Sequence, residues 1–82
     1  MNKTKIIKLS GLKPDEKAII SGYSQGKKEY RRKLLSFGLT PGTEITMKKA
    51  APLGDPVEIS LRGYSLSLRK AEAEVLELER KI

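Results

Sequence analysis

Along most of this chain, hydrophobic residues alternate with polar ones in short runs. Such alternation is typical of strands that turn one side to a core and the other to solvent. The pattern predicts strands at the following positions: residues 5–9, 17–23, 43–49, 57–62 and 64–69, and around Leu76 and Leu78. Between these runs, proline and glycine predict tight turns at Lys13-Pro14-Asp15, Pro41-Gly42 and Arg62-Gly63.

One stretch changes to the helical period. Tyr30, Leu34 and Phe37 are spaced by four and then three residues, which puts them on one side of a helix over residues 26–37. Gly38 suits the left-handed position that commonly ends a helix.

These elements predict a mainly β fold with little helix. Residues 70–74 contain two alanines and add one short helical turn before the last strand. We expect a small SH3-like barrel of five or six short strands, with one α-helix between the second and third strands, because closing the sheet removes exposed edges. The chain has 82 residues and no internal repeat or linker, so a single domain over residues 1–82 is expected.

Composition excludes most catalytic chemistry. Cysteine and histidine are both absent, which rules out zinc fingers, iron–sulfur clusters, thiol catalysis and Ser-His-Asp triads. No GxxxxGK phosphate loop occurs either. We therefore expect a protein that is not an enzyme and has no cofactor.

Asp55 and Glu58 are the weak candidates for a metal site made of oxygen ligands. Asp55 fits better as an acceptor for amides of its own loop. Because soft and imidazole ligands are missing, a single chain is expected to bind transition metals only weakly.

The charge balance indicates an acidic partner. Seventeen lysines and arginines stand against ten acidic residues, a formal net charge of +7, and such an excess attracts anionic surfaces. Two stretches are the most basic: residues 1–13, with Lys3, Lys5, Lys8 and Lys13, and residues 27–33, with Lys27, Lys28, Arg31, Arg32 and Lys33 against Glu29.

On the predicted helix, Lys28, Arg31 and Arg32 project away from the apolar stripe, and Leu35 falls among them. Arginine can form forked bonds to carboxylates, and a leucine beside it can serve as an apolar anchor. This face is therefore a candidate docking surface for a protein.

Nucleic acid is the alternative partner. Small barrels bind it through basic grooves and exposed aromatic rings that stack on bases. Tyr30, Phe37 and Tyr64 fall at inward positions, which leaves Tyr23 as the one ring expected to be free. Membrane spanning is not expected, because no apolar run approaches the ~18 residues that a span needs. Without a secretory signal, a cytoplasmic location is expected.

Three further stretches stand in order along residues 30–73. They are Tyr30-Arg31-Arg32-Lys33-Leu34-Leu35-Ser36-Phe37-Gly38-Leu39-Thr40-Pro41-Gly42, Ala51-Pro52-Leu53-Gly54-Asp55-Pro56-Val57 and Ser65-Leu66-Ser67-Leu68-Arg69-Lys70-Ala71-Glu72-Ala73. Their order and spacing resemble the helix and turn, the central loop and the C-terminal hairpin of the ferrous iron transport protein A (FeoA) family.

This resemblance implies an SH3-like barrel that assists ferrous iron uptake. It implies a partner, FeoB, the membrane transporter of ferrous iron with a cytoplasmic GTP-binding domain. Similar domains also occur in iron- or manganese-dependent repressors, but this chain lacks the winged-helix part that such a repressor needs. We expect the chain to bind FeoB on its cytoplasmic side and to modulate transport or the nucleotide cycle.

The expected docking surface combines the basic helix face with the loop over residues 52–56. Its residues are Lys28, Arg31, Arg32, Leu35, Pro52, Leu53, Gly54, Asp55 and Pro56. The loop has a simpler interpretation as a rigid hairpin connection in which Leu53 folds back onto the core.

Overall fold

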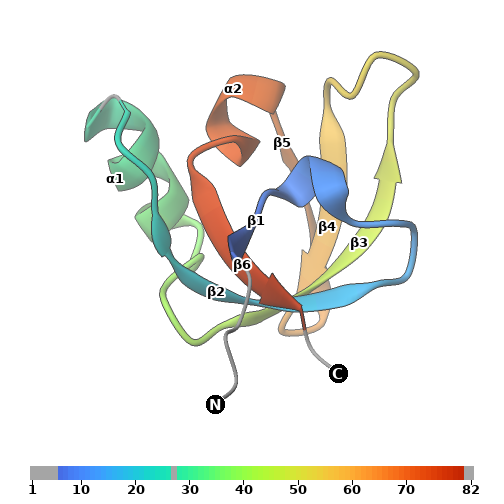
Figure 1. Ribbon diagram of the computed structural model, residues 1–82, viewed down its shortest axis with the longest axis horizontal. Helices are drawn as coiled ribbons and strands as arrows, with labels where there is room; N and C mark the ends of the chain where they lie inside the picture. Colours follow the sequence, from blue (N-terminus) through green and yellow to red (C-terminus); the bar gives the residue numbers. More distant parts are fainter. Residues whose placement is uncertain (1–5, 27, 81–82) are drawn as a thin grey trace.

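The computed structural model describes residues 6–26 and 28–80 (Figure 1). In chain order its elements are β1 (Ile6–Ile7), the 3₁₀ turn η1 (Leu9–Gly11), β2 (Lys17–Tyr23), α1 (Lys28–Ser36), β3 (Glu44–Ala50), β4 (Val57–Leu61), β5 (Tyr64–Leu68), α2 (Lys70–Ala73) and β6 (Leu76–Arg80). The predicted mainly β fold, with one helix between the second and third strands and a short one before the last, is confirmed. Lys3, Lys5 and Lys27 lie outside the described residues.

The strands form one antiparallel sheet in the order β1-β6-β2-β3-β4-β5. The last strand of the chain therefore lies between the first two. Irregular pairing between Ile20 and Gly22, and again between Met47 and Lys49, interrupts the ladder. Such bulges bend strands, and the sheet curls into an SH3-like barrel with α1 at one side and α2 at one end (Figure 1).

The strand expected over residues 5–9 is wrong in its second half. Of the described residues 6–9, Ile6 and Ile7 pair with β6, while Leu9 begins the 3₁₀ turn η1. Leu9 and Leu12 are both buried. A turn at this point folds both leucines onto the core, whereas in a continuing strand two side chains three residues apart would point to opposite faces of the sheet.

Alternation along the strands places their apolar residues in a common core. Ile45 lies opposite Ala18, and Met47 lies opposite Ile59. The side chains that are buried are Leu9, Leu12, Ala18, Ile20, Leu34, Leu39, Ile45, Met47, Val57, Ile59, Leu61, Leu68, Ala73, Val75, Leu76 and Leu78. The inward positions predicted for β3 and β4 are confirmed.

Tyr64 departs from its predicted inward position and is 45% exposed. It begins an edge strand beside the C-terminal end of α1, and its hydroxyl donates a hydrogen bond to the carbonyl oxygen of Phe37. A phenol has both an apolar ring and a polar tip, so the edge position suits it. The tyrosine therefore joins the β4–β5 hairpin to the helix.

The helix α1 ends as predicted at Gly38, whose φ is +86°. The N–H of Gly38 donates to the carbonyl of Leu35, and the N–H of Leu39 donates to the carbonyl of Leu34. This pair of bonds is the Schellman motif. Because Leu34 and Leu39 are both fully buried, the cap also locks the end of α1 onto the core.

The turns predicted from proline and glycine form at the expected positions. Gly42 has a φ of +93°, and Arg62 and Gly63 both have positive φ, as type II and type I′ turns require. In the first turn, the side chain of Glu16 accepts the N–H of Lys13. Asp15 takes a left-handed φ of 70°.

Adjacent leucines of α1 allow a matched test of this packing. Leu34 is fully buried, whereas Leu35 is 42% exposed. We expect Leu34→Ala to lower the free energy of unfolding by about 2–5 kcal/mol, because it leaves a cavity. Leu35→Ala should change it by less than about 0.5 kcal/mol. Urea unfolding measures both, and similar losses for the two variants would contradict this placement of α1.

Candidate functional site

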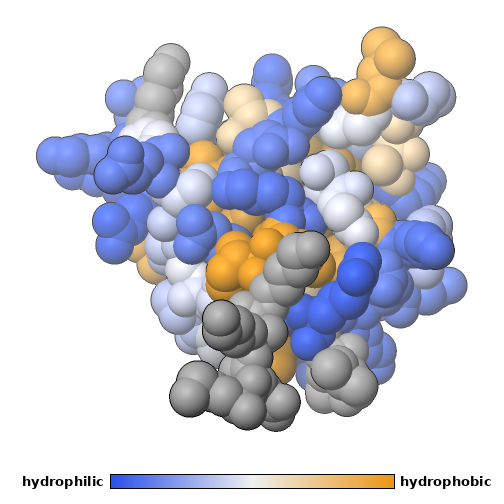
Figure 2. All heavy atoms as spheres, in the orientation of Figure 1, coloured by the Kyte–Doolittle hydropathy of each residue, from blue (hydrophilic) through white to orange (hydrophobic). Residues whose placement is uncertain are grey.

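The outer face of α1 is a surface of unneutralised positive charge. Lys28, Arg31 and Arg32 are exposed, and no carboxylate of residues 6–26 and 28–80 lies within salt-bridge distance of them. Leu35 is exposed on the same helix. Hydrophilic side chains cover this side of the molecule (Figure 2). We call Lys28, Arg31, Arg32 and Leu35 the α1 face.

Tyr23 lies beside the α1 face and is not the free stacking ring that was expected. Its ring is half-buried and packs against the core. The guanidinium of Arg31 lies over the ring, 5.4 Å from its centroid, and the hydroxyl donates to the carbonyl of Leu39. Burial raises the pKa of Tyr23, and the positive charge of Arg31 offsets part of this rise. The ring that stacking on a base would need is therefore already covered by Arg31.

A buried carboxylate that the sequence did not single out holds α1 in place. Glu72 in α2 is 4% exposed, and its Oε2 lies 2.6 Å from Nζ of Lys33 in α1. Its Oε1 accepts the backbone N–H of Arg69, at 3.0 Å. One glutamate thus caps α2 and pairs with α1. The spacing Arg69–Glu72 was the available signal, since an acid three residues into a helix commonly bonds back to the residue before it.

The environment of Glu72 favours its charged form. Burial raises the pKa of this carboxyl, but the hydrogen bonds from Lys33 and the Arg69 backbone, with the charges of Lys33 and Arg69, outweigh burial and hold the pKa below its usual value. Arg69 therefore contributes both its backbone N–H and its positive charge to this site.

The loop over residues 52–56 lies at the other end of the molecule from α1, along its longest axis (Figure 1). Leu53 is 86% exposed, so the interpretation in which it folds back onto the core is wrong. Hydrophobic spheres project over this loop in Figure 2. The two halves of the expected docking surface, α1 and the loop, are therefore separate surfaces.

The carboxylates considered for metal binding have other partners. Asp55 accepts the backbone N–H of Lys70 at the start of α2, rather than an amide of its own loop. Glu58 lies 3.8 Å from Nζ of Lys49. Within residues 6–26 and 28–80, no three acidic side chains come together as a metal site would require.

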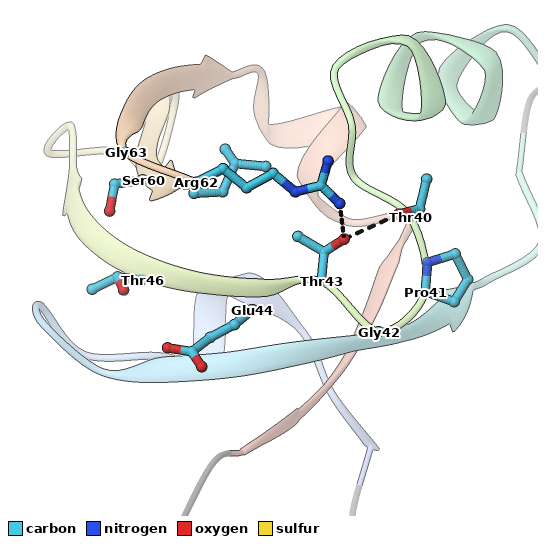
Figure 3. Close-up of a pocket in the computed structure, with 10 residues that line it drawn as sticks. Thr40, Pro41, Gly42, Thr43, Glu44, Thr46, Ser60, Arg62 and Gly63 are labelled. Carbon is cyan, nitrogen blue, oxygen red and sulfur yellow. Dashed lines mark hydrogen bonds between the residues drawn. The ribbon is translucent and has the colours of Figure 1, made fainter.

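A hollow of about 590 Å³ lies between β3 and the β4–β5 turn, and its lining includes the hydroxyl side chains of Thr40, Thr43, Thr46 and Ser60 (Figure 3). At its centre, Thr43 is buried, and its Oγ1 lies 3.0 Å from Oγ1 of Thr40. Arg62 donates from Nη2 to the same Thr43 oxygen, at 3.3 Å. These bonds tie the β4–β5 turn to the connection that follows α1, so the arrangement positions the helix.

The six-stranded barrel with its two helices defines a small SH3-like module. The FeoA domain model matches residues 7–80, and the chain belongs to the FeoA domain family. Membership of this family of non-catalytic accessory domains confirms that the chain is not an enzyme.

A curated relative ties the family to ferrous iron transport. It is the "Fe(2+) transport protein A/Fe(2+) transporter FeoB fusion protein" of Porphyromonas gingivalis, 34% identical over 73 residues. The match covers 89% of this chain and 8% of the fusion protein, so the chain spans a small part of that relative's length.

Solved structures share the fold. The FeoA-like protein from Clostridium acetobutylicum is 41% identical, with a TM-score of 0.85 over 98% of this chain and 92% of that one. A manganese-dependent transcriptional repressor has a TM-score of 0.87 over 98% of this chain and 44% of its own, at 9% identity. The second likeness shows the fold alone. In the described part of the chain, no helix is long and apolar enough to cross a membrane.

We expect Glu72→Gln to lower the free energy of unfolding at neutral pH by about 1–3 kcal/mol, because it removes the charge that pairs with Lys33. The folded pKa of Glu72 lies below its unfolded value. Its contribution is therefore complete above the unfolded pKa and is lost as pH falls through the folded pKa. Urea unfolding as a function of pH measures this dependence.

The Glu72→Gln variant should lose less stability than the parent protein on acidification, since it lacks the carboxyl whose pKa is lowered in the folded state. An equal loss in the parent and in Glu72→Gln would show that the Lys33–Glu72 pair does not contribute in this way.

Proposed function

We propose that this protein is an accessory of ferrous iron uptake that binds the cytoplasmic part of a FeoB-type transporter through the α1 face. The observation that carries the proposal is the row of exposed cations, Lys28, Arg31 and Arg32, without a carboxylate partner in the described part of the chain. The fusion of a relative to FeoB supports the choice of partner. Its place of action is the inner face of the membrane, reached through FeoB.

Binding is the means by which a module of this kind acts. A bound domain changes its partner only if it prefers one of the partner's conformations. We infer that contact with the α1 face stabilises one state of the transporter and so modulates transport or the nucleotide cycle. In a fusion protein the linked module has a high effective concentration beside its partner, so even a weak contact is occupied. We therefore infer that the contact is weak when the module is a separate chain.

The loop at the opposite end is the second proposed contact. It comprises Pro52, Leu53, Gly54, Asp55 and Pro56. Leu53 is exposed while Asp55 is held by the N–H of Lys70, so the loop presents an apolar tip on a fixed base. The molecule is 35 Å along its longest axis. A partner that contacts both surfaces at once must therefore extend along this axis from α1 to the loop.

Nucleic acid binding, the alternative, is less well supported. Arg31 covers the ring of Tyr23, and the hydroxyl of Tyr64 bonds to the end of α1. Tyr23, the ring beside the α1 face, is therefore not a free platform for a base, so the basic surface favours an acidic protein.

Reversing the charge of two arginines tests the α1 face. We expect Arg31→Glu with Arg32→Glu to weaken binding to the cytoplasmic domain of the cognate FeoB at least about tenfold, since acidic contacts become repulsive. Stability should change by about 1 kcal/mol or less. Calorimetric titration and ferrous iron uptake in cells report the effect.

The control variant, Lys13→Glu with Lys17→Glu, makes the same change in net charge at exposed positions on other elements. Unchanged binding and iron uptake in the arginine variant, or an equal loss in the control, would exclude the α1 face as the docking surface.

A single substitution tests the loop. Leu53→Ser should leave thermal unfolding unchanged within about 0.5 kcal/mol, because the side chain is exposed. We expect it to weaken FeoB binding several-fold by removing an apolar contact. Wild-type affinity in this variant would leave the loop with the role of a hairpin connection only.

A further inference from the structure

A hollow of about 440 Å³ lies where β2 gives way to α1. Its lining includes Tyr23, Ser24, Gln25, Lys28, Arg31 and Val75. Two of these side chains, Lys28 and Arg31, carry positive charge. None of the described residues that line it is acidic. The hollow therefore brings two cations together without a counter-charge in the described part of the chain.

The backbone forms this hollow by a close approach at Gly26. A Cβ atom at this position would lie 3.3 Å from Cγ2 of Val75, tighter than ordinary van der Waals contact. Glycine thus allows the segment before α1 to pack on the residue that precedes β6. This contact fixes the first turn of α1, with Lys28, beside Tyr23.

Arg31 differs from Arg32 in being held in place. Its guanidinium lies over the ring of Tyr23, and that ring is anchored by burial and by the bond from its hydroxyl to Leu39. A phenol is protonated at neutral pH, and burial raises the pKa of Tyr23 further, so the hydroxyl keeps its donor role. Ordering an arginine side chain before binding reduces the entropy lost on contact.

We propose that this hollow is a carboxylate-binding pocket for an acidic side chain of the docking partner, with Arg31 as its main contact and Tyr23 as the residue that positions Arg31. The inference rests on the proposed function of the α1 face and assigns its chemistry. The planar guanidinium offers two parallel N–H donors to the two oxygens of a carboxylate. Lys28 adds a second positive charge.

Phosphate would satisfy the same donors, but the surroundings favour a protein carboxylate. Leu35 lies one helical turn beyond Arg31 and is 42% exposed, so the two side chains project from the same side of α1. Arg31 beside Leu35 is complementary to a segment of the partner in which an acidic residue lies next to an aliphatic one. A free phosphate would make no use of Leu35.

The decisive experiment compares Arg31→Lys with Arg32→Lys in calorimetric titrations with the cytoplasmic domain of the cognate FeoB. Both variants keep the net charge, so long-range attraction is the same. We expect Arg31→Lys to weaken binding about tenfold, because it loses the forked contact, and Arg32→Lys to stay within about twofold. Equal effects of the two variants would overturn the pocket while leaving the α1 face as the docking surface.

Two substitutions of Tyr23 test its positioning role. Tyr23→Phe keeps the ring beneath Arg31, whereas Tyr23→Leu removes it. We expect Tyr23→Leu to weaken binding several-fold more than Tyr23→Phe. Binding enthalpy and affinity are compared at a temperature at which unfolding curves show that both variants are folded. If Tyr23→Leu does not fold, the Arg31→Lys and Arg32→Lys pair decides alone. Equal affinity of folded Phe and Leu variants would remove Tyr23 from the proposal.

A titration with inorganic pyrophosphate at constant ionic strength tells whether the pocket binds phosphate or a protein carboxylate. We expect no saturable shift of the amide NMR signals of residues 23–31. A saturable shift that Arg31→Lys abolishes would mean that the pocket binds phosphate, and the carboxylate assignment would be wrong. Failure of the wild-type protein to bind the FeoB domain would overturn the proposed function, and with it this inference.

Discussion

The placement of α1 depends on one buried carboxylate. Glu72 accepts a hydrogen bond from the backbone N–H of Arg69, at the start of α2, and forms an ion pair with the ammonium of Lys33 in α1. It therefore joins two helices that lie outside the hydrogen-bonded sheet. A charge buried in this way is stable only while its partners remain. The requirement links the ionisation of Glu72 to the position of the surface that we assign to docking.

Other polar contacts act on the same helix. The hydroxyls of Tyr23 and Tyr64 donate to carbonyls that follow α1, and Arg62 bonds to Thr43 further along the connection. Apolar burial of Leu34 supplies attraction without direction, whereas these bonds set the orientation. Together they hold a helix with an exposed basic face against a barrel, and a fixed face loses less entropy when a partner binds it.

The fold itself does not decide the function. A manganese-dependent repressor shares it at 9% identity, so the specific chemistry must come from surface residues. We propose that in this chain those residues lie on two surfaces, the α1 face and the loop at the opposite end. A small barrel with both ends of its long axis available for contact is suited to work as an adaptor.

The alternation of apolar residues, the turn residues and the stripe of α1 were enough to predict the strand order along the chain, the helix and most of the core, because side-chain period and turn chemistry are local properties. The helical period also predicted that the cations of the α1 face would be exposed. Local rules could not predict that Glu72 would be buried beside Lys33, that Tyr23 would support Arg31 or that Tyr64 would face outward. These outcomes depend on which distant segments the curled sheet brings together, and only the tertiary structure decides that.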